Sequence, residues 1–209
     1  MVNGILGKKL GMTQVFDESG SVVPVTVIEA GPCVVTQIKT ETSDGYNGVQ
    51  VAFGDAKEKH VTKPMQGHFA KAGVGLKRHV HEVTVDDLSE VEVGKEIKVD
   101  VFSEGDTIKV TGVSRGKGFA GAVKRHHFHG GDMGHGCMVH RKPQSGGATD
   151  AARTFKGSRR PGRMGGKPVT QRGLIVYRVD PQRNLMLVGG AVPGGKGELV
   201  IISRQGVGG

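Results

Sequence analysis

A stretch of 59 residues without a single Leu or Ile divides this 209-residue chain into two kinds of sequence. Residues 114–172 contain only three Val, but 13 Gly and 13 Lys or Arg against two acids, which gives a net charge of +11. Such a stretch cannot bury enough apolar surface to offset roughly 1–2 kcal/mol of backbone entropy per residue. We therefore expect residues 114–172 to build no hydrophobic core and to form a long, largely irregular extension.

The remaining 150 residues carry 16 basic and 18 acidic side chains, a net charge of −2, so the positive charge of the +9 protein lies in the basic stretch. Like charges at this density repel one another unless a counter-charge is supplied. A solvated linker has no use for 13 cations and almost no anions. Nucleic acid supplies the counter-charge, because Gly lets the backbone approach phosphates and Arg forks onto phosphate or stacks on bases.

Runs of β-branched residues flank the basic stretch on both sides, and Gly31-Pro32 and Asp44-Gly45 are typical of turns between them. The predicted strands are residues 22–29, 33–39, 49–53, 80–85, 96–101, 107–113, 174–179, 184–188 and 198–203. Only residues 66–73 are predicted to form a short helix. Many short strands at this spacing favour a small barrel or a sandwich. The fold class is mainly β, with one globular domain formed by residues 1–113 and 173–209.

A group of imidazoles and one thiol within the basic stretch raises the alternative of a metal site. The group contains His126, His127, His129, His135, Cys137 and His140. Zinc takes four nitrogen or sulfur ligands, but His135-x-Cys137-x-x-His140 matches no common zinc spacing, and no second Cys pair exists. The same imidazoles can stack on bases or donate to phosphate. We predict no bound metal and no catalytic residue, and keep a metal- or nucleotide-dependent RNA-acting enzyme as the alternative.

The segment Gly190–Gly197 nearly fits the phosphate-binding loop G-x-x-x-x-G-K-[ST]. Gly197 stands where that loop needs a hydroxyl to ligate magnesium. The segment also leads into the predicted strand 198–203, whereas the phosphate loop must open a helix. We interpret it as a glycine-rich turn between strands, and predict no cofactor and no small-molecule substrate.

The sequence shows no apolar run long enough to span a bilayer, which requires about 18 to 20 residues. The first residues lack the apolar core of a signal peptide. We therefore expect a cytoplasmic protein with no membrane partner. Cys33 and Cys137 are too few for a disulfide framework and are expected to be free thiols.

Several motifs, in the same order along nearly the whole chain, resemble the bacterial members of the ribosomal protein L3 family of the large subunit. They are residues 4–16 (GILGKKLGMTQVF), 24–27 (PVTV), 44–46 (DGY), 63–69 (KPMQGHF), 116–121 (GKGFAG), 155–157 (FKG) and 190–194 (GAVPG). One region departs from the pattern: residues 143–150 are slightly shortened and lack a Gln at the place that is methylated in some relatives.

The resemblance implies a β-barrel like that of translation factors and a central extension that runs through ribosomal RNA toward the peptidyl transferase centre. It also implies a non-enzymatic protein that binds large-subunit RNA beside neighbouring ribosomal proteins early in subunit assembly, with residues 1–16 as a second RNA contact. The expected RNA-binding residues are the cations and imidazoles of these two segments: Lys8, Lys9, Arg115, Lys117, Lys124, Arg125, His126, His127, His140, Arg141, Lys142, Arg153, Lys156, Arg159, Arg160, Arg163, Lys167 and Arg172.

Overall fold

The computed structural model describes residues 2–85, 88, 91–143, 145–147 and 149–205. The chain divides into two compact units, which are described separately below. Unit 1 comprises Met1–Val113 and Pro168–Gly209, and unit 2 comprises Ser114–Lys167.

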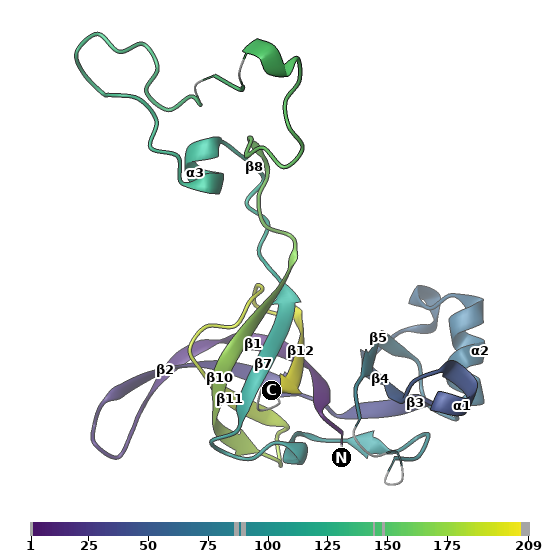
Figure 1. The fold of residues 1–209 in the computed structure, drawn as a ribbon. Helices are drawn as coiled ribbons and strands as arrows, with labels where there is room; N and C mark the ends of the chain where they lie inside the picture. Colours follow the sequence, from purple (N-terminus) through teal and green to yellow (C-terminus); the bar gives the residue numbers. More distant parts are fainter. Residues whose placement is uncertain (1, 86–87, 89–90, 144, 148, 206–209) are drawn as a thin grey trace. The chain divides into compact units, whose positions relative to one another are not determined.

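Six strands of unit 1 form a closed antiparallel barrel, as the mainly β prediction expected (Figure 1). Around the barrel the strands follow the order β1-β12-β7-β10-β11-β2. The bounds are β1 (Gly4–Phe16), β2 (Val22–Ala30), β7 (Thr107–Val113), β10 (Pro168–Asp180), β11 (Leu185–Gly189) and β12 (Leu199–Arg204). The barrel closes because β1 pairs with β12 on one side and with β2 on the other. Alternate side chains point inward, and Val25, Ile108 and Ile202 are fully buried there.

Strand β1 was not predicted as a strand, because Gly4, Gly7 and Gly11 interrupt its apolar pattern. In the structure Ile5 and Leu6 are fully buried in the core. Gly7 is required by close packing: a Cβ at this position would lie 2.8 Å from the carbonyl oxygen of Glu29 on β2. Glycine in a strand often marks such a close approach of two backbones. The glycines that obscured the strand pattern are therefore part of the barrel.

A second sheet in unit 1 has the strand order β5-β4-β3-β6. Its strands are β3 (Cys33–Lys39), β4 (Gly48–Asp55), β5 (Lys77–Val83) and β6 (Glu96–Ile97). Unit 1 also contains the short helices α1 (Glu41–Asp44), η1 (Glu58–His60) and η2 (Val99–Val101) and the longer helix α2 (Lys63–Lys71). Buried residues of this sheet, including Val35, Val49 and Val51, join barrel residues such as Ile5 and Ile28 in one continuous hydrophobic core.

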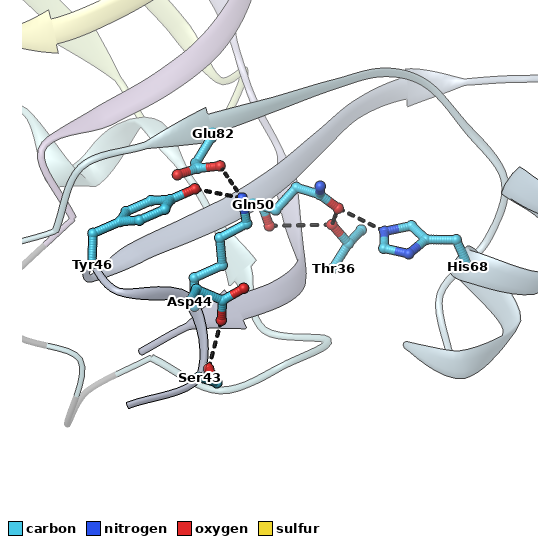
Figure 2. A network of polar contacts seen from close by, with 8 residues as sticks. Thr36, Ser43, Asp44, Tyr46, Gln50, His68 and Glu82 are labelled. Carbon is cyan, nitrogen blue, oxygen red and sulfur yellow. Dashed lines mark hydrogen bonds and ion pairs between the residues drawn. The ribbon is translucent and has the colours of Figure 1, made fainter. Parts of the chain in front are cut away.

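Helix α2 is held on the second sheet by a buried ring and a polar network. Phe69 is 1% exposed. His68 Nε2 lies 2.6 Å from Gln50 Oε1, which also accepts a hydrogen bond of 2.7 Å from Thr36 Oγ1, so β3, β4 and α2 are joined (Figure 2). The predicted helix 66–73 is thus present but begins earlier, because Pro64 is tolerated in the first turn of a helix.

Unit 2 contains the strands β8 (Phe119–Ala120) and β9 (Gly162–Arg163) and the helices α3 (Ala122–His126) and η3 (Thr149–Ala151). The expected boundary at residue 172 lies five residues too far along the chain, because β10 begins at Pro168 and pairs with β7 from there on. Side chains 168–173 of β10 are all exposed, so this part of the strand shows no alternation of apolar residues. None of the helices among the described residues is long and apolar enough to cross a membrane.

Candidate nucleic-acid interface

The two ends of unit 2 run antiparallel as a narrow two-stranded stem. Backbone hydrogen bonds of 2.9 Å join Gly166 N to Ser114 O, Lys117 N to Met164 O, and Met164 N to Gly118 O. Phe119 and Arg163 then pair as β8 and β9. The stem therefore presents its side chains outward instead of enclosing a core, and Phe119 is 80% exposed.

Glycine allows the strands of the stem to approach this closely. Gly165 has a φ of +72°, and a Cβ there would overlap the carbonyl oxygen of Arg115. A φ in this range is unfavourable for residues with a side chain. The glycines of this stretch were expected to let the backbone approach phosphates. At Gly165 the close approach is instead between two backbone segments of the protein itself.

Beyond the stem, helix α3 and the returning chain are joined through the backbone of Arg160. The Arg125 guanidinium donates to Arg160 O at 2.7 Å, and His126 Nε2 lies 3.1 Å from the same oxygen. The Arg160 side chain donates to Gly146 O at 3.2 Å. Arg125 and His126, both predicted to bind RNA, are half-buried and brace unit 2 internally.

The tip of unit 2 is a loop closed by hydrogen bonds between residues 131–132 and His140. Gly131 N donates to His140 O at 2.9 Å, and His140 Nδ1 lies 2.9 Å from Asp132 O. A Cβ at Gly130 or Gly131 would overlap the carbonyl oxygens of His140 or Val139. The departure from the family pattern at residues 143–150 includes Gln144 and Ala148, which lie outside the described residues.

Most of the 18 expected RNA-binding residues lie on the surface. The exposed ones are Lys8, Arg115, Lys117, Lys124, His127, His140, Arg141, Lys142, Arg153, Lys156, Arg159, Arg160, Arg163, Lys167 and Arg172. Arg172 lies on β10 and Lys8 on β1, so both belong to unit 1. The exposed residues of the expected set therefore lie mainly, but not solely, in unit 2.

Lys9 differs from the other expected residues because its side chain is only 5% exposed. Its ammonium group donates to Val192 O at 2.6 Å and to Gly194 O at 3.2 Å, inside unit 1. The glycine-rich segment 190–197 is a turn leading into strand β12, as predicted, and its carbonyl groups hold Lys9. We therefore leave Lys9 out of the candidate interface.

The Lys and Arg side chains of unit 2 form no ion pair with an acid among the described residues. Unit 2 holds 12 Lys or Arg and two acids, a net charge of +10. Across the described ranges of the chain, the ion pairs are Lys39–Glu82, Lys77–Asp55 and Arg204–Asp106, all within unit 1. The positive charge of unit 2 is therefore available to an external polyanion.

Exposed apolar side chains accompany this charge, and sequence reasoning did not single them out. Phe119 is 80% exposed, Met138 96% and Phe155 59%, and the Arg153 guanidinium lies 5.0 Å from the centroid of the Phe155 ring. A cleft of about 450 Å³ is lined by His126, His127, Phe128, Arg141 and Arg159, among others. Rings beside cations suit unstacked bases and phosphates. Their position inside the acid-poor stretch was the signal that could have identified them.

The imidazoles and the thiol of unit 2 do not form a metal centre among the residues that the structure describes, where no group of three or more His, Cys, Asp or Glu side chains could hold a metal ion. Cys137 Sγ instead donates to Val139 O at 3.3 Å, and the His140 ring is bonded to Asp132 O. Cys33 and Cys137 are both free thiols, as predicted.

These features define the protein as a β-barrel protein whose cationic unit 2 is suited to bind a polyanion. Comparison with known proteins identifies its family. The family model described as Ribosomal protein L3 matches residues 82–189. A protein of Carboxydothermus hydrogenoformans called large ribosomal subunit protein uL3 is 54% identical over 204 residues, 98% of each chain. A protein of the same name from Heliobacterium modesticaldum is 55% identical over 202 residues, 97% of this chain and 96% of the relative.

The chain therefore belongs to the ribosomal protein L3 family, as the motifs predicted. It is a structural constituent of the large ribosomal subunit and not an enzyme. The alternative of a metal- or nucleotide-dependent RNA-acting enzyme is therefore wrong.

Proposed function

We propose that the chain binds the RNA of the large ribosomal subunit directly, with unit 2 as its principal contact. The observation that carries this proposal is the set of 12 Lys and Arg in unit 2 that form no ion pair within the described residues. Each cation that neutralises a phosphate releases counterions, which is the main source of affinity for RNA. The narrow stem and its exposed side chains fit a segment that passes between RNA helices.

The residues proposed for this contact have different roles. Arg141, Lys142 and Arg159 are exposed and make no hydrogen bond with the described part of the chain, so they are free to bind phosphate. Arg125 and Arg160 bond to carbonyl groups of unit 2 and set the shape that the RNA meets. Phe119 and Phe155 offer ring faces on which a base can stack.

We further propose that unit 2 contributes to early subunit assembly and that its tip reaches toward the peptidyl transferase centre. The resemblance to the family supports both statements. Unit 2 has little apolar surface of its own to bury, so contact with RNA would complete its packing. Neighbouring ribosomal proteins are the expected further partners of unit 1.

Photo-crosslinking tests direct contact with RNA. A photoreactive benzophenone analogue of phenylalanine replaces Phe119, whose ring is 80% exposed, in protein that is incorporated into large subunits. We expect crosslinks to large-subunit RNA. The control carries the analogue at Ile175, which is 57% exposed on β10 of unit 1. Crosslinks from position 119 to proteins alone would contradict the proposal.

A further inference from the structure

Unit 1 carries a second concentration of positive charge, outside both segments that the sequence singled out. Residues 57–81 hold six Lys or Arg and four His against one acid, Glu58, a net charge of +5. The rest of unit 1 holds 11 basic and 17 acidic side chains, a net charge of −6. The net charge of unit 1 is therefore close to zero because the basic residues 57–81 and the acidic remainder offset one another.

The structure brings part of this charge together around one cleft of about 560 Å³. Lys57 and Lys59 come from the η1 region and Arg78 from β5, and all three are exposed. Val61, Met65 and Val80 line the same cleft and are half-buried. We call the surface formed by Lys57, Lys59 and Arg78 around this cleft the α2 face.

The α2 face is built on a rigid support. The buried ring of Phe69 and the hydrogen bonds that join Thr36, Gln50 and His68 hold α2 on the sheet (Figure 2). Side chains alternate along a strand, so Arg78, Val80 and Glu82 of β5 lie on the same side of the sheet. A cleft with fixed walls can hold a ligand without ordering the chain first.

Nearby carboxylates offset little of this charge. Glu82 lies 2.6 Å from Lys39 Nζ, and the hydrogen bond from Lys39 holds the pKa of Glu82 below its usual range. Asp55 pairs with Lys77 at 2.7 Å. Lys57, Lys59 and Arg78, in contrast, make no ion pair or side-chain hydrogen bond with the described residues.

Two simpler explanations for these cations are weaker. Charged residues on the edge strand β5 would discourage pairing with other chains, and a solvated helix is commonly charged. Lys is common on protected strand edges, but Lys57 and Lys59 lie outside β5, and a solvated helix carries acids as well as bases. Neither explains six cations and one acid in 25 residues.

The composition of the face favours RNA over a protein partner. Protein interfaces are depleted in Lys and enriched in aromatic residues, Met and Arg. The α2 face has two exposed Lys and one Arg, while Phe69, the aromatic residue that lines its cleft, is 1% exposed. Lys on a flexible stem is suited to phosphate as a point charge.

We propose that the α2 face is a second RNA-binding site, which binds the phosphate backbone of large-subunit RNA independently of unit 2. This inference rests on the proposed function for the identity of the polyanion. It adds to that function a contact made by the folded domain itself, at residues distant in sequence from the basic stretch.

The test compares full-length proteins on large-subunit RNA by hydroxyl-radical footprinting and by the dependence of affinity on salt. The face variant carries Lys57→Gln, Lys59→Gln and Arg78→Gln. The matched control carries Lys98→Gln, Lys109→Gln and Lys196→Gln, which remove three exposed cations elsewhere on unit 1. A charge-preserving variant carries Lys57→Arg and Lys59→Arg.

We expect the face variant to lose one discrete patch of RNA protection and to flatten the slope of log affinity against log salt by roughly 2 to 3, since each phosphate contact contributes ~0.7–0.9. The control and the charge-preserving variant should keep that patch, and protection by unit 2 should persist in all variants.

An unchanged footprint and slope in the face variant would overturn the inference. Loss of a neighbouring ribosomal protein with the RNA protection intact would also overturn it, since the face would then bind protein. Failure of the proposed function would show separately, as absence of the unit 2 protection in the wild-type protein.

Discussion

The ammonium group of Lys9 donates a hydrogen bond of 2.6 Å to the carbonyl oxygen of Val192, 183 residues further along the chain. The same group reaches Gly194 O, and the backbone of Lys9 is bonded to Gly197 N and Glu198 O at 2.7 and 3.0 Å. The buried ammonium group of Lys9 thus joins β1, the first strand of the barrel, to the loop that precedes β12, the last strand.

We predict that Lys9→Met lowers the free energy of unfolding by about 1–3 kcal/mol, because carbonyl groups that accept from the ammonium would remain buried without a partner. Lys8→Met is the matched control, since Lys8 is the exposed neighbour on the same strand. Chemical denaturation of both variants measures the effect. Equal stability of the two would mean that the ammonium bonds contribute nothing to the barrel.

Lys9 also illustrates what the sequence alone could not distinguish. Lys8 and Lys9 are adjacent cations, and nothing in the sequence shows that strand alternation exposes one and buries the other against a loop from the far end of the chain. Gly4, Gly7 and Gly11 interrupt the apolar pattern of β1, although Gly7 is there because β1 and β2 lie too close for a Cβ. A strand of this kind becomes recognisable only when its partners are known.

The strands that alternate in the usual way were predicted, since residues such as Ile108, Val188 and Ile202 are fully buried and alternate with less buried neighbours. The first half of β10 was missed because its side chains are exposed and its place is fixed by pairing with β7. For the candidate site, charge composition located the basic stretch. It could not reveal that Arg125 and Arg160 are used to brace unit 2, nor that residues 57–81 gather around a cleft.

Gly165 tests the geometry of the stem. A Cβ at this position would overlap the carbonyl oxygen of Arg115, and the φ of +72° is itself unfavourable for Ala by roughly 1–2 kcal/mol. We predict that Gly165→Ala opens the stem and increases hydrogen exchange at the Gly166 amide. Gly116→Ala is the control, because a Cβ there meets nothing within 4 Å. Equal protection of the Gly166 amide in both variants would contradict the described stem.

The two thiols should differ in reactivity. Cys33 is fully buried, and burial raises its pKa to about 12, whereas Cys137 is half-buried. We predict that Cys137 reacts with a disulfide reagent in the native protein and that Cys33 reacts only after unfolding. Cys137→Ser should abolish the fast phase. Equal rates for the two thiols would be inconsistent with the described burial.

The raised pKa of Cys33 also has a consequence for stability. The unfolded thiol ionises near its ordinary value of 9.0, while the native thiol stays protonated to about 12. The native state therefore binds more protons between these values, and this contribution to stability is lost as the pH rises above 9.0.

Replacing residues 130–150 with a glycine–serine linker tests the proposed position of the tip. Unit 1 should remain folded, because its core contains no residue of this segment. We expect the rebuilt large subunits to mature poorly, or to form peptide bonds more slowly and respond differently to antibiotics of the catalytic centre. Wild-type maturation, peptide-bond formation and antibiotic response would mean that the tip lies far from that centre.

The central claim is that exposed cations of unit 2 neutralise RNA phosphates, and the salt dependence of RNA binding tests it most directly. The measurement is the slope of log affinity against log salt for a large-subunit RNA fragment, with wild type, with Arg141→Gln, Lys142→Gln and Arg159→Gln combined, and with the Lys98, Lys109 and Lys196 control. Our account predicts that the unit 2 variant flattens the slope by roughly 2 to 3, while the control matches wild type. A slope in the unit 2 variant equal to that of the control would contradict the account.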